Sequence, residues 1–344
     1  MTVTVLSLVI GAELLMGHIS GRLLIPYFRK LKTGKFEPYI GDRFSQDGSE
    51  PRLGGAVILV CMLIGTLTGT AWFSSRNDLS GRADLRLILA AFTACGLMCA
   101  LGAYEDILRD KGANVGLKPA YKHILRFTVI FGALVLLRVF GFRESAVLLP
   151  FHWGYLELGA LYMPVTALAG TVFLSAVTVC DCPGGKTQLG VDGLCPALLM
   201  IMLMGITAGL TVTDLRPEAQ LMACAGMGAA GGYLFWGLCP SKIYFGESGA
   251  LALGTAAVLC CVLARGELIL LIGGGAILAD AFCALLQYVV FRTTKKLLFK
   301  GYTLHEHLER LGFGKYKIIG LGAAVQVLFA AAVIMFIIYS GKFL

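Results

Sequence analysis

Residues 318–340 read IIGLGAAVQVLFAAAVIMFIIYS, an apolar stretch without a single charged side chain. A helix of about 20 such residues is long enough to cross the roughly 30 Å hydrocarbon core of a bilayer. Similar stretches recur along the chain, so we predict an all-α, polytopic integral membrane protein with about ten transmembrane helices. The predicted spans are residues 3–26, 53–73, 86–104, 123–141, 161–179, 193–213, 218–237, 249–264, 268–290 and 318–340.

The overall composition argues against a soluble protein. Of the 344 residues, 57% are hydrophobic and only 15% are charged, and the mean hydropathy is +0.79. No segment between the spans is long enough to form a separate soluble domain, so we expect residues 1–344 to form a single transmembrane domain. We find no nucleic-acid-binding module. The 11 cysteines include no CxxC pair of the kind that binds structural zinc.

The distribution of Lys and Arg predicts how the chain is oriented. Cytoplasmic loops of membrane proteins are enriched in these two residues. Most of the 29 Lys and Arg residues fall in alternate loops, and Lys118, Lys122 and Arg126 are counted with the second of them. This bias predicts that both termini lie outside. The predicted cytoplasmic loops are residues 27–52, 105–122, 180–192, 238–248 and 291–317.

Acidic and histidine residues gather at the ends of the predicted spans, all on the predicted cytoplasmic side. A carboxylate is costly in hydrocarbon, so one at a helix end beside water is either incidental or part of a site. Several on one surface indicate a site for a divalent metal ion and phosphate. The residues are Glu105, Asp106, Asp181, Asp192, Glu247, His305, Glu306 and His307.

Glu105 and Asp106 close the third predicted span. Adjacent carboxylates repel each other, so the pKa of one of them should rise unless a cation lies beside them. This favours a bound Mg²⁺, or a general base that takes a proton from a weak nucleophile. The alternative is a solvated helix end, aided by Arg109.

Glu247 lies between two glycines in the segment YFGESG, residues 244–249. Glycine permits tight turns and a close approach of the backbone to a ligand. The helix predicted to follow has N-terminal amides that attract anions. The alternative is that Glu247 and Ser248 only cap this helix.

Asp181 precedes a Pro-Gly-Gly turn, and Lys186 follows that turn. Lys186 could contact a phosphate, but the phosphate-loop pattern GxxxxGK[ST] is not matched. Asp192, at the start of a predicted span, has the better claim to a function by its position.

His305, Glu306 and His307 form a tract that resembles a metal-binding sequence. Side chains at i and i+2 do not share a helix face, so chelation by both imidazoles would need an extended or loop segment. Donation of hydrogen bonds from imidazole to a diphosphate is an equal alternative, and an ordinary surface loop is the third. A short interfacial helix is predicted in this loop from the apolar stripe of Leu297, Leu298, Leu304, Leu308 and Leu311.

Taken in order, these clusters resemble the motifs of the phospho-N-acetylmuramoyl-pentapeptide transferase family, a branch of the polyprenyl-phosphate sugar-1-phosphate transferases. The resemblance covers nearly the whole chain. The matching stretches are Pro51–Gly55 (family PTMGG), Gly102–Asp106 (GxxDD), Gly116–Lys122 (GLxxxxK), Ser175–Thr178 with Gly190–Leu194 (NAVNLTDGLDGLA), Tyr244–Gly254 (FMGDTGSLALG) and Leu304–Glu309 (LHHHFE).

The resemblance implies transfer of a phospho-amino-sugar from a uridine diphosphate carrier to undecaprenyl phosphate, with release of uridine monophosphate. The product would be lipid I, in peptidoglycan precursor synthesis, and the reaction would need Mg²⁺ at the cytoplasmic face of a bacterial plasma membrane. A homodimer is kept as one alternative for the assembly.

By the same resemblance, Glu247 with Glu105 or Asp106 would hold Mg²⁺, and Asp106 would activate the lipid phosphate. Asp192 would contact the uracil. The residues expected to bind phosphates or to support these groups are Lys122, His305, His307, Asp181 and Glu306. Asp181 matches the first aspartate of its motif if residues 182–189 are an insertion, and otherwise Leu189 does.

The chain departs from the family at several of these positions. The family's paired aspartates appear as Glu105 and Asp106, its later metal-binding aspartate as Glu247, and an asparagine as Thr178. Retained charge at both glutamates favours a metal site of adjusted geometry, whereas the lysine expected before Pro51 is missing. Three alternatives therefore remain: a different UDP-sugar donor, a polyprenyl-phosphate-binding pseudoenzyme, or a transporter that uses the intramembrane acids Glu13 and Asp280.

Overall fold

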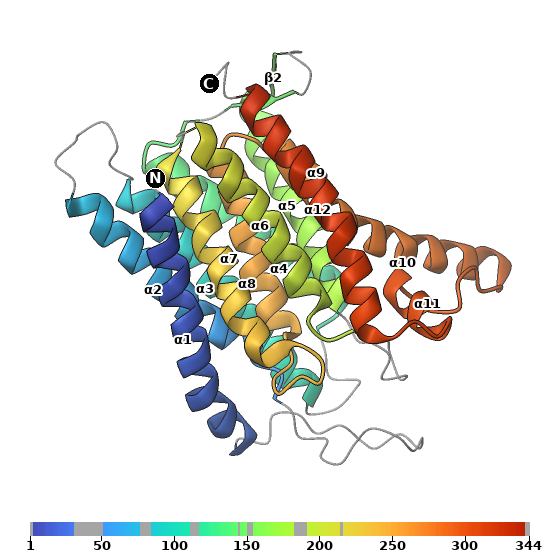
Figure 1. Ribbon diagram of the computed structural model, residues 1–344. Coiled ribbons are helices and arrows are strands. Elements are labelled where there is room, and N and C mark those ends of the chain that lie inside the picture. Colours follow the sequence, from blue (N-terminus) through green and yellow to red (C-terminus); the bar gives the residue numbers. More distant parts are fainter. Residues whose placement is uncertain are drawn as a thin grey trace.

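The computed structural model describes residues 3–30, 51–75, 84–110, 117–143, 145–149, 154–181, 191–213 and 216–340. Within these ranges the chain is almost entirely helical, as predicted (Figure 1). Helices suit lipid because they satisfy every backbone amide and carbonyl within one segment. The helices are α1 (Val3–Lys30), α2 (Gly54–Ser75), α3 (Leu85–Asp110), α4 (Pro119–Val139), α5 (Tyr162–Asp181), α6 (Leu194–Thr213), α7 (Pro217–Gly237), α8 (Gly246–Leu263), α9 (Leu268–Gly273), α10 (Gly275–Thr294), α11 (Leu304–Arg310) and α12 (Lys315–Ser340).

Nine helices in the described part of the chain are long and apolar enough to cross a membrane. The protein is therefore a multi-pass membrane protein, and the predicted fold class is confirmed. The one predicted span that is not among these nine, 218–237, corresponds to α7, which is less apolar because it carries Gln220 and several glycines. Helix α7 still belongs to the bundle, since it packs against α1, α2, α6 and α8.

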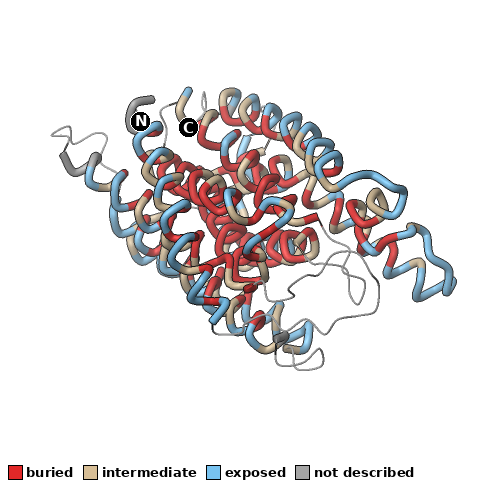
Figure 2. The backbone as a smooth tube through the Cα atoms, turned by 60° about the horizontal axis from the view of Figure 1, so that its bottom comes forward, coloured by how far each residue is buried: buried red, intermediate tan, exposed pale blue. Residues whose placement is uncertain are grey.

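Helix α8 occupies the centre of the bundle. Nearly all of its residues are buried, and it packs against α2, α3, α5 and α7. The burial view shows the same organisation, with buried residues in the middle and exposed residues around them (Figure 2). Many exposed side chains on the outer helices are large and apolar, as expected for surfaces that face lipid. The start of α8 is thus held from several sides.

The predicted span 268–290 is broken into α9 and α10 at Gly274. A Cβ at Gly274 would lie 2.5 Å from the Phe173 ring and 2.7 Å from the Leu270 carbonyl oxygen, so only glycine fits this bend. Figure 1 shows α10 leaving the bundle sideways, with α11 beside it. The span predicted as one helix is therefore two helices, which meet at the three consecutive glycines Gly273, Gly274 and Gly275.

Two short elements differ from the sequence-based expectation. Strands β1 (Ala146–Leu148) and β2 (Tyr155–Glu157) form an antiparallel hairpin between α4 and α5 that was not predicted. The interfacial helix predicted over Leu297 to Leu311 is shorter, because α11 begins only at Leu304. Leu297 and Leu298 precede it and are exposed.

The start of α8, which carries Glu247, lies at the end of the bundle opposite the two chain termini. Helix α1 begins and α12 ends at one end of the bundle, whereas α8 and α12 begin at the other (Figure 1). The side of the membrane that each end faces stays a prediction from the charge distribution. Residues 31–50, 111–116 and 182–190, which include Lys186 and Leu189, lie outside the described part of the predicted loops.

Candidate active site

The start of α8 is held by a carboxylate from α3. The backbone amides of Glu247 and Ser248 donate hydrogen bonds to the two oxygens of Asp106, over 3.1 and 3.0 Å. The N-terminal end of a helix carries a partial positive charge that stabilises an anion there. Asp106 therefore caps α8. The N-cap residue is Phe245, whose side chain makes no capping hydrogen bond. The alternative in which Glu247 and Ser248 cap this helix themselves is thus wrong.

Two glycines allow this close approach of α3 and α8. Gly246 has φ +68°, a conformation that favours glycine, and a Cβ there would lie 2.7 Å from Asp106 Oδ2. A Cβ at Gly102, on α3, would lie 2.6 Å from Ser248 Cα. The glycines of the GxxDD-like and YFGESG segments thus serve packing at the site.

The PRLGG segment, residues 51–55, lies beside the same turn. The amide of Tyr244 donates to the Pro51 carbonyl over 2.9 Å, and the amide of Gly54 donates to the Tyr244 carbonyl over 3.1 Å. The Ser248 hydroxyl also lies 3.4 Å from the Arg52 carbonyl oxygen. Two motifs that are far apart in the sequence are therefore joined in the structure.

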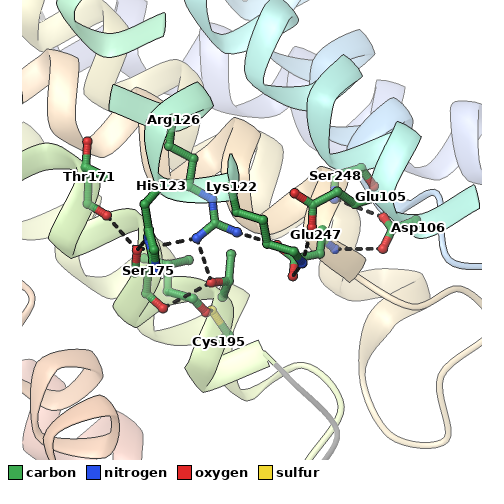
Figure 3. A network of polar contacts seen from close by, with 12 residues as sticks. Glu105, Asp106, Lys122, His123, Arg126, Thr171, Ser175, Cys195, Glu247 and Ser248 are labelled. Atoms are coloured by element: carbon green, nitrogen blue, oxygen red, sulfur yellow. Dashed lines mark hydrogen bonds and ion pairs between the residues drawn. The ribbon is translucent and has the colours of Figure 1, made fainter. Parts of the chain in front are cut away.

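Helix α4 contributes two cations to this place. Lys122 forms an ion pair with Glu105 Oε2, and its Nζ lies 3.7 Å from Glu247 Oε1. One turn later, Arg126 Nη2 donates to Glu247 Oε2 over 2.9 Å (Figure 3). We refer to Glu105, Asp106, Lys122, Arg126 and Glu247 as the acid–cation cluster.

The cluster is buried except for its lysine. Glu105 is 1% exposed, Arg126 2% and Glu247 7%, whereas the Lys122 side chain is 16% exposed. Buried charges are tolerated when each has a partner, and removal of one partner leaves the other uncompensated. Lys122 is thus the member of the cluster best placed to leave its partner for an incoming anion.

Arg126 was counted as a loop residue in the sequence, and the structure corrects this. It lies in α4 and is buried, and its Nη1 lies 3.3 Å from Thr178 Oγ1 and 3.4 Å from Ser175 Oγ. Two sequence signals could have identified it. It is a cation inside an apolar span, and its i, i+4 spacing from Lys122 puts both side chains on one face of the helix.

The expected magnesium ion can be tested against these donors. Mg²⁺ prefers oxygen ligands in near-octahedral geometry, with one or two carboxylates beside phosphates and waters. Here Glu105 and Glu247 are paired with Lys122 and Arg126, and Asp106 accepts two backbone amides. No three His, Cys, Asp or Glu side chains in the described ranges are arranged to hold a metal ion. The donors in this arrangement do not fit a divalent ion, and the magnesium requirement stays a prediction.

Asp181 and Asp192 lie at the edge of the same region. Asp181 accepts a hydrogen bond from the Gly246 amide and interacts electrostatically with Asp106, Glu247 and Asp192. The Ser241 hydroxyl donates to Asp192 Oδ2 over 3.1 Å. Burial raises the pKa of Asp192, although Lys315 and the Ser241 hydroxyl act against this rise. The sequence-based grouping of these acids with Glu247 agrees with their placement, and their roles stay predictions.

The histidine tract lies on α11, so the loop geometry considered for it is wrong. His305 Nδ1 lies 2.9 Å from Asp280 Oδ2, and the His305 amide donates to Asp280 Oδ1 over 3.1 Å. The backbone amide of Lys300 donates to His307 Nδ1 over 3.1 Å. These contacts tie α11 to α10 and to the loop before α11, and they give the intramembrane acid Asp280 hydrogen-bond partners.

Glu306 and Thr303 form the N-terminal cap of α11. The Glu306 amide donates to the Thr303 hydroxyl over 3.4 Å, and the Tyr302 amide donates to Glu306 Oε2 over 2.7 Å. The Thr303 hydroxyl supplies the N-cap half of a capping box, whose signature T-x-x-E is visible in the sequence, whereas Glu306 reaches the amide of Tyr302, one residue before the N-cap. Glu306 stands where the family motif LHHHFE has a histidine, and its role in the structure is to hold the start of α11.

Glu13, the other intramembrane acid, lies within α1 and is fully buried. Its carboxyl group fills space beside Gly65 and Gly228, where a Cβ would overlap its oxygens. Neither oxygen has a hydrogen-bond partner in the described part of the chain. Glu13 and Asp280 thus contact different helices and do not form a pair.

The comparisons with known proteins agree with this arrangement. Residues 87–265, just over half of the chain, match the model of glycosyl transferase family 4. The chain is 27% identical over 320 residues to a phospho-N-acetylmuramoyl-pentapeptide-transferase of Clostridioides difficile (strain 630), with 91% of each chain covered. It is 28% identical over 318 residues to the enzyme of the same name from Bacillus subtilis (strain 168), with 90% of this chain and 92% of that enzyme covered. The α3–α8 segment that builds the acid–cation cluster is thus the segment that the family model matches, and the chain belongs to glycosyl transferase family 4.

Proposed function

We propose that the protein transfers a phospho-amino-sugar, of the phospho-N-acetylmuramoyl-pentapeptide type, from a uridine diphosphate carrier to undecaprenyl phosphate. Family membership supports a transferase with a sugar-nucleotide donor and a polyprenyl-phosphate acceptor. The observation that carries the proposal is the acid–cation cluster, in which Lys122 and Arg126 meet Glu105 and Glu247 at the ends of membrane-spanning helices. A lipid acceptor and a water-soluble donor can meet only at such a boundary.

The reaction exchanges one phosphorus–oxygen bond for another. An oxygen of the lipid phosphate forms a bond to the phosphorus that carries the sugar. The bond from this phosphorus to the bridging oxygen breaks, and that oxygen leaves on uridine monophosphate. Nucleophile and leaving group are both anionic, so positioned cations do most of the catalytic work. Lys122, the most exposed member of the cluster, is our candidate to bind one of these phosphates.

The part proposed for Asp106 follows from its hydrogen bonds. Both of its oxygens already accept backbone amides of α8. A phosphate monoester has its second pKa near 6, so it is largely ionised at neutral pH without a strong base. We therefore favour Asp106 as the residue that positions the start of α8 and Glu247, ahead of the role of general base that the resemblance implies.

The donor is proposed to bind toward Asp192 and α11. Asp192 lies next to Ser241 and near Lys315, and its contact to uracil is carried over from the resemblance. Asp280 orients His305 and the Lys300 amide orients His307, and both histidines are kept as proposed phosphate ligands. From the same resemblance we propose that the protein lies in a bacterial plasma membrane and that its active site faces the cytoplasm. A homodimer stays one alternative for its assembly.

Release of uridine monophosphate tests the proposal. Purified protein in proteoliposomes with undecaprenyl phosphate is given a panel of UDP-sugars, with UDP-N-acetylmuramoyl-pentapeptide first, with and without Mg²⁺. We expect native turnover and a loss of about 100-fold or more in Lys122→Met, the usual cost of losing one transition-state donor. The matched control is Lys118→Met, because Lys118 is exposed just before α4 and should leave turnover within about threefold.

Three outcomes would change the proposal. Equal activity of native protein and Lys122→Met would remove Lys122 from the site. Turnover with a different UDP-sugar alone would keep the reaction and change the donor. No release with any donor, together with retained binding of undecaprenyl phosphate, would make the protein a binding protein. Sealed vesicles of each orientation, with donor added outside, test the side of the membrane.

A further inference from the structure

Arg126 is a charged residue in a place where charge is costly. It lies on α4 within a membrane-spanning segment, and it is only 2% exposed. A cation at such a position is rare, marks a functional site by default, and pairs with a named partner. Its carboxylate partner is Glu247, at 2.9 Å. Glu247 is also the residue at which the sequence predicted a metal ion.

The three acids of the acid–cation cluster already have positive partners, and Asp181, which also interacts with Glu247, lies outside this cluster. Glu105 is paired with Lys122, and Glu247 is paired with Arg126. Asp106 is paired with the positive end of α8 through two amides. Each acid of the cluster therefore has its own positive partner from this chain. A divalent ion in this arrangement would compete with two side-chain cations for the same oxygens.

The guanidinium is held in place by more than its charge. Nη2 contacts Glu247 while Nη1 faces Thr178 and Ser175 on α5, so Arg126 joins α4, α5 and α8 (Figure 3). Its Nε is buried and has no hydrogen-bond acceptor in the ranges that the structure describes. Arg is always protonated and offers five donors in a planar fork, which suits phosphate oxygens. A third donor of the same guanidinium is thus left for an acceptor.

We propose that Arg126 is the resident cation of Glu247: its guanidinium holds the position of a divalent ion, so Glu247 binds such an ion only when Arg126 is absent. Lys122 and Arg126 then face the diphosphate of the substrate. This part rests on the proposed function, because it takes the cluster to be the phosphate-binding site. The metal exclusion itself does not depend on turnover.

Binding of Mn²⁺ to the full-length protein tests this inference. Mn²⁺ shares the oxygen preference of Mg²⁺, and its unbound fraction is measured by electron paramagnetic resonance. Four forms of the metal-stripped protein are titrated with Mn²⁺ in detergent. They are the native protein, Arg126→Gln, the double variant Arg126→Gln/Glu247→Gln, and Arg138→Gln. We expect Arg126→Gln to bind one Mn²⁺ at least tenfold more tightly than native protein, and the double variant to lose this site. Arg138, exposed on the same helix, is the control and should change nothing.

Native protein alone gives a second reading, which does not require an Arg126 variant to fold. If native protein binds one Mn²⁺ and Glu247→Gln abolishes that binding, the inference is overturned. If native protein and Glu247→Gln bind Mn²⁺ equally weakly, it is supported. Arg126→Lys keeps a cation and should also fail to gain the tight site. Mn²⁺ binding is measured without substrate, so its outcome is independent of the transferase assay. The metal-exclusion inference can fail while the proposed function holds, and it can hold while the proposed function fails.

Discussion

At the scale of single residues, Glu105 and Asp106 show how neighbours in the sequence acquire different tasks. Glu105 meets Lys122 from α4, and Asp106 meets the amides at the start of α8. The adjacency of the two carboxylates left open either a raised pKa or a neighbouring cation, and the structure places Lys122 beside Glu105. The identity of that cation, and the partner of Asp106 in another helix, depend on tertiary contacts that the local sequence does not contain.

Replacement of Asp106 tests its role as the cap of α8. Asp106→Ala leaves the amides of Glu247 and Ser248 without their acceptor, and loss of such a cap costs about 0.5–2 kcal/mol. Asp106→Asn keeps one acceptor oxygen and should cost less. Free energies of unfolding, measured by titration with a denaturing detergent, should rank native above Asn above Ala. An Ala variant as stable as native protein would contradict the cap.

Some residues of the site were within reach of the sequence and some were not. Arg126 carried a signal, since a cation in an apolar span is unusual, and the N-cap Thr303 carried one in its T-x-x-E pattern. The pairing of His305 with Asp280 could not have been foreseen in this way. It depends on the bend at Gly274 that directs α10 away from the bundle, and the direction of a bend is set by packing.

At the scale of elements, apolar length was the reliable signal. It located the helices of the described bundle, because a hydrocarbon environment leaves few alternatives to a helix. The β-hairpin between α4 and α5 was missed, since it is short and carries no membrane constraint. Which glycines make close helix contacts is decided by the partner helix, so the local sequence does not identify them.

Two glycines of α3 give a matched test of this packing. Gly102→Ala places a Cβ 2.6 Å from Ser248 Cα, so the start of α8 must shift. Overpacking of this kind costs about 1–3 kcal/mol and should also lower transferase activity. Gly96→Ala, on the same helix, has nothing within 4 Å of its Cβ and should be neutral or slightly stabilising. Equal effects of both substitutions on unfolding would contradict the contact.

At the scale of the whole molecule, segments far apart in the chain meet at one end of the bundle. The ends of α3 and α5 and the start of α8 bring Glu105, Asp106, Asp181 and Glu247 together, as the motif order indicated. The sequence could predict this grouping because each acid lies where an apolar span ends. It could not predict that two cations of α4 would occupy the carboxylates, which is the feature that distinguishes the site.

Arg126 and Glu247, 121 residues apart in the sequence, form a buried ion pair at the centre of this site. A double-mutant cycle on the free energy of unfolding tests it, with Arg126→Met, Glu247→Leu and both together. Each single change should cost about 3–5 kcal/mol, because it removes the nearest opposite charge from a buried charge, and the double change should cost far less than the sum. A coupling of at least about 2 kcal/mol is predicted, whereas costs that add within about 0.5 kcal/mol would contradict the pair.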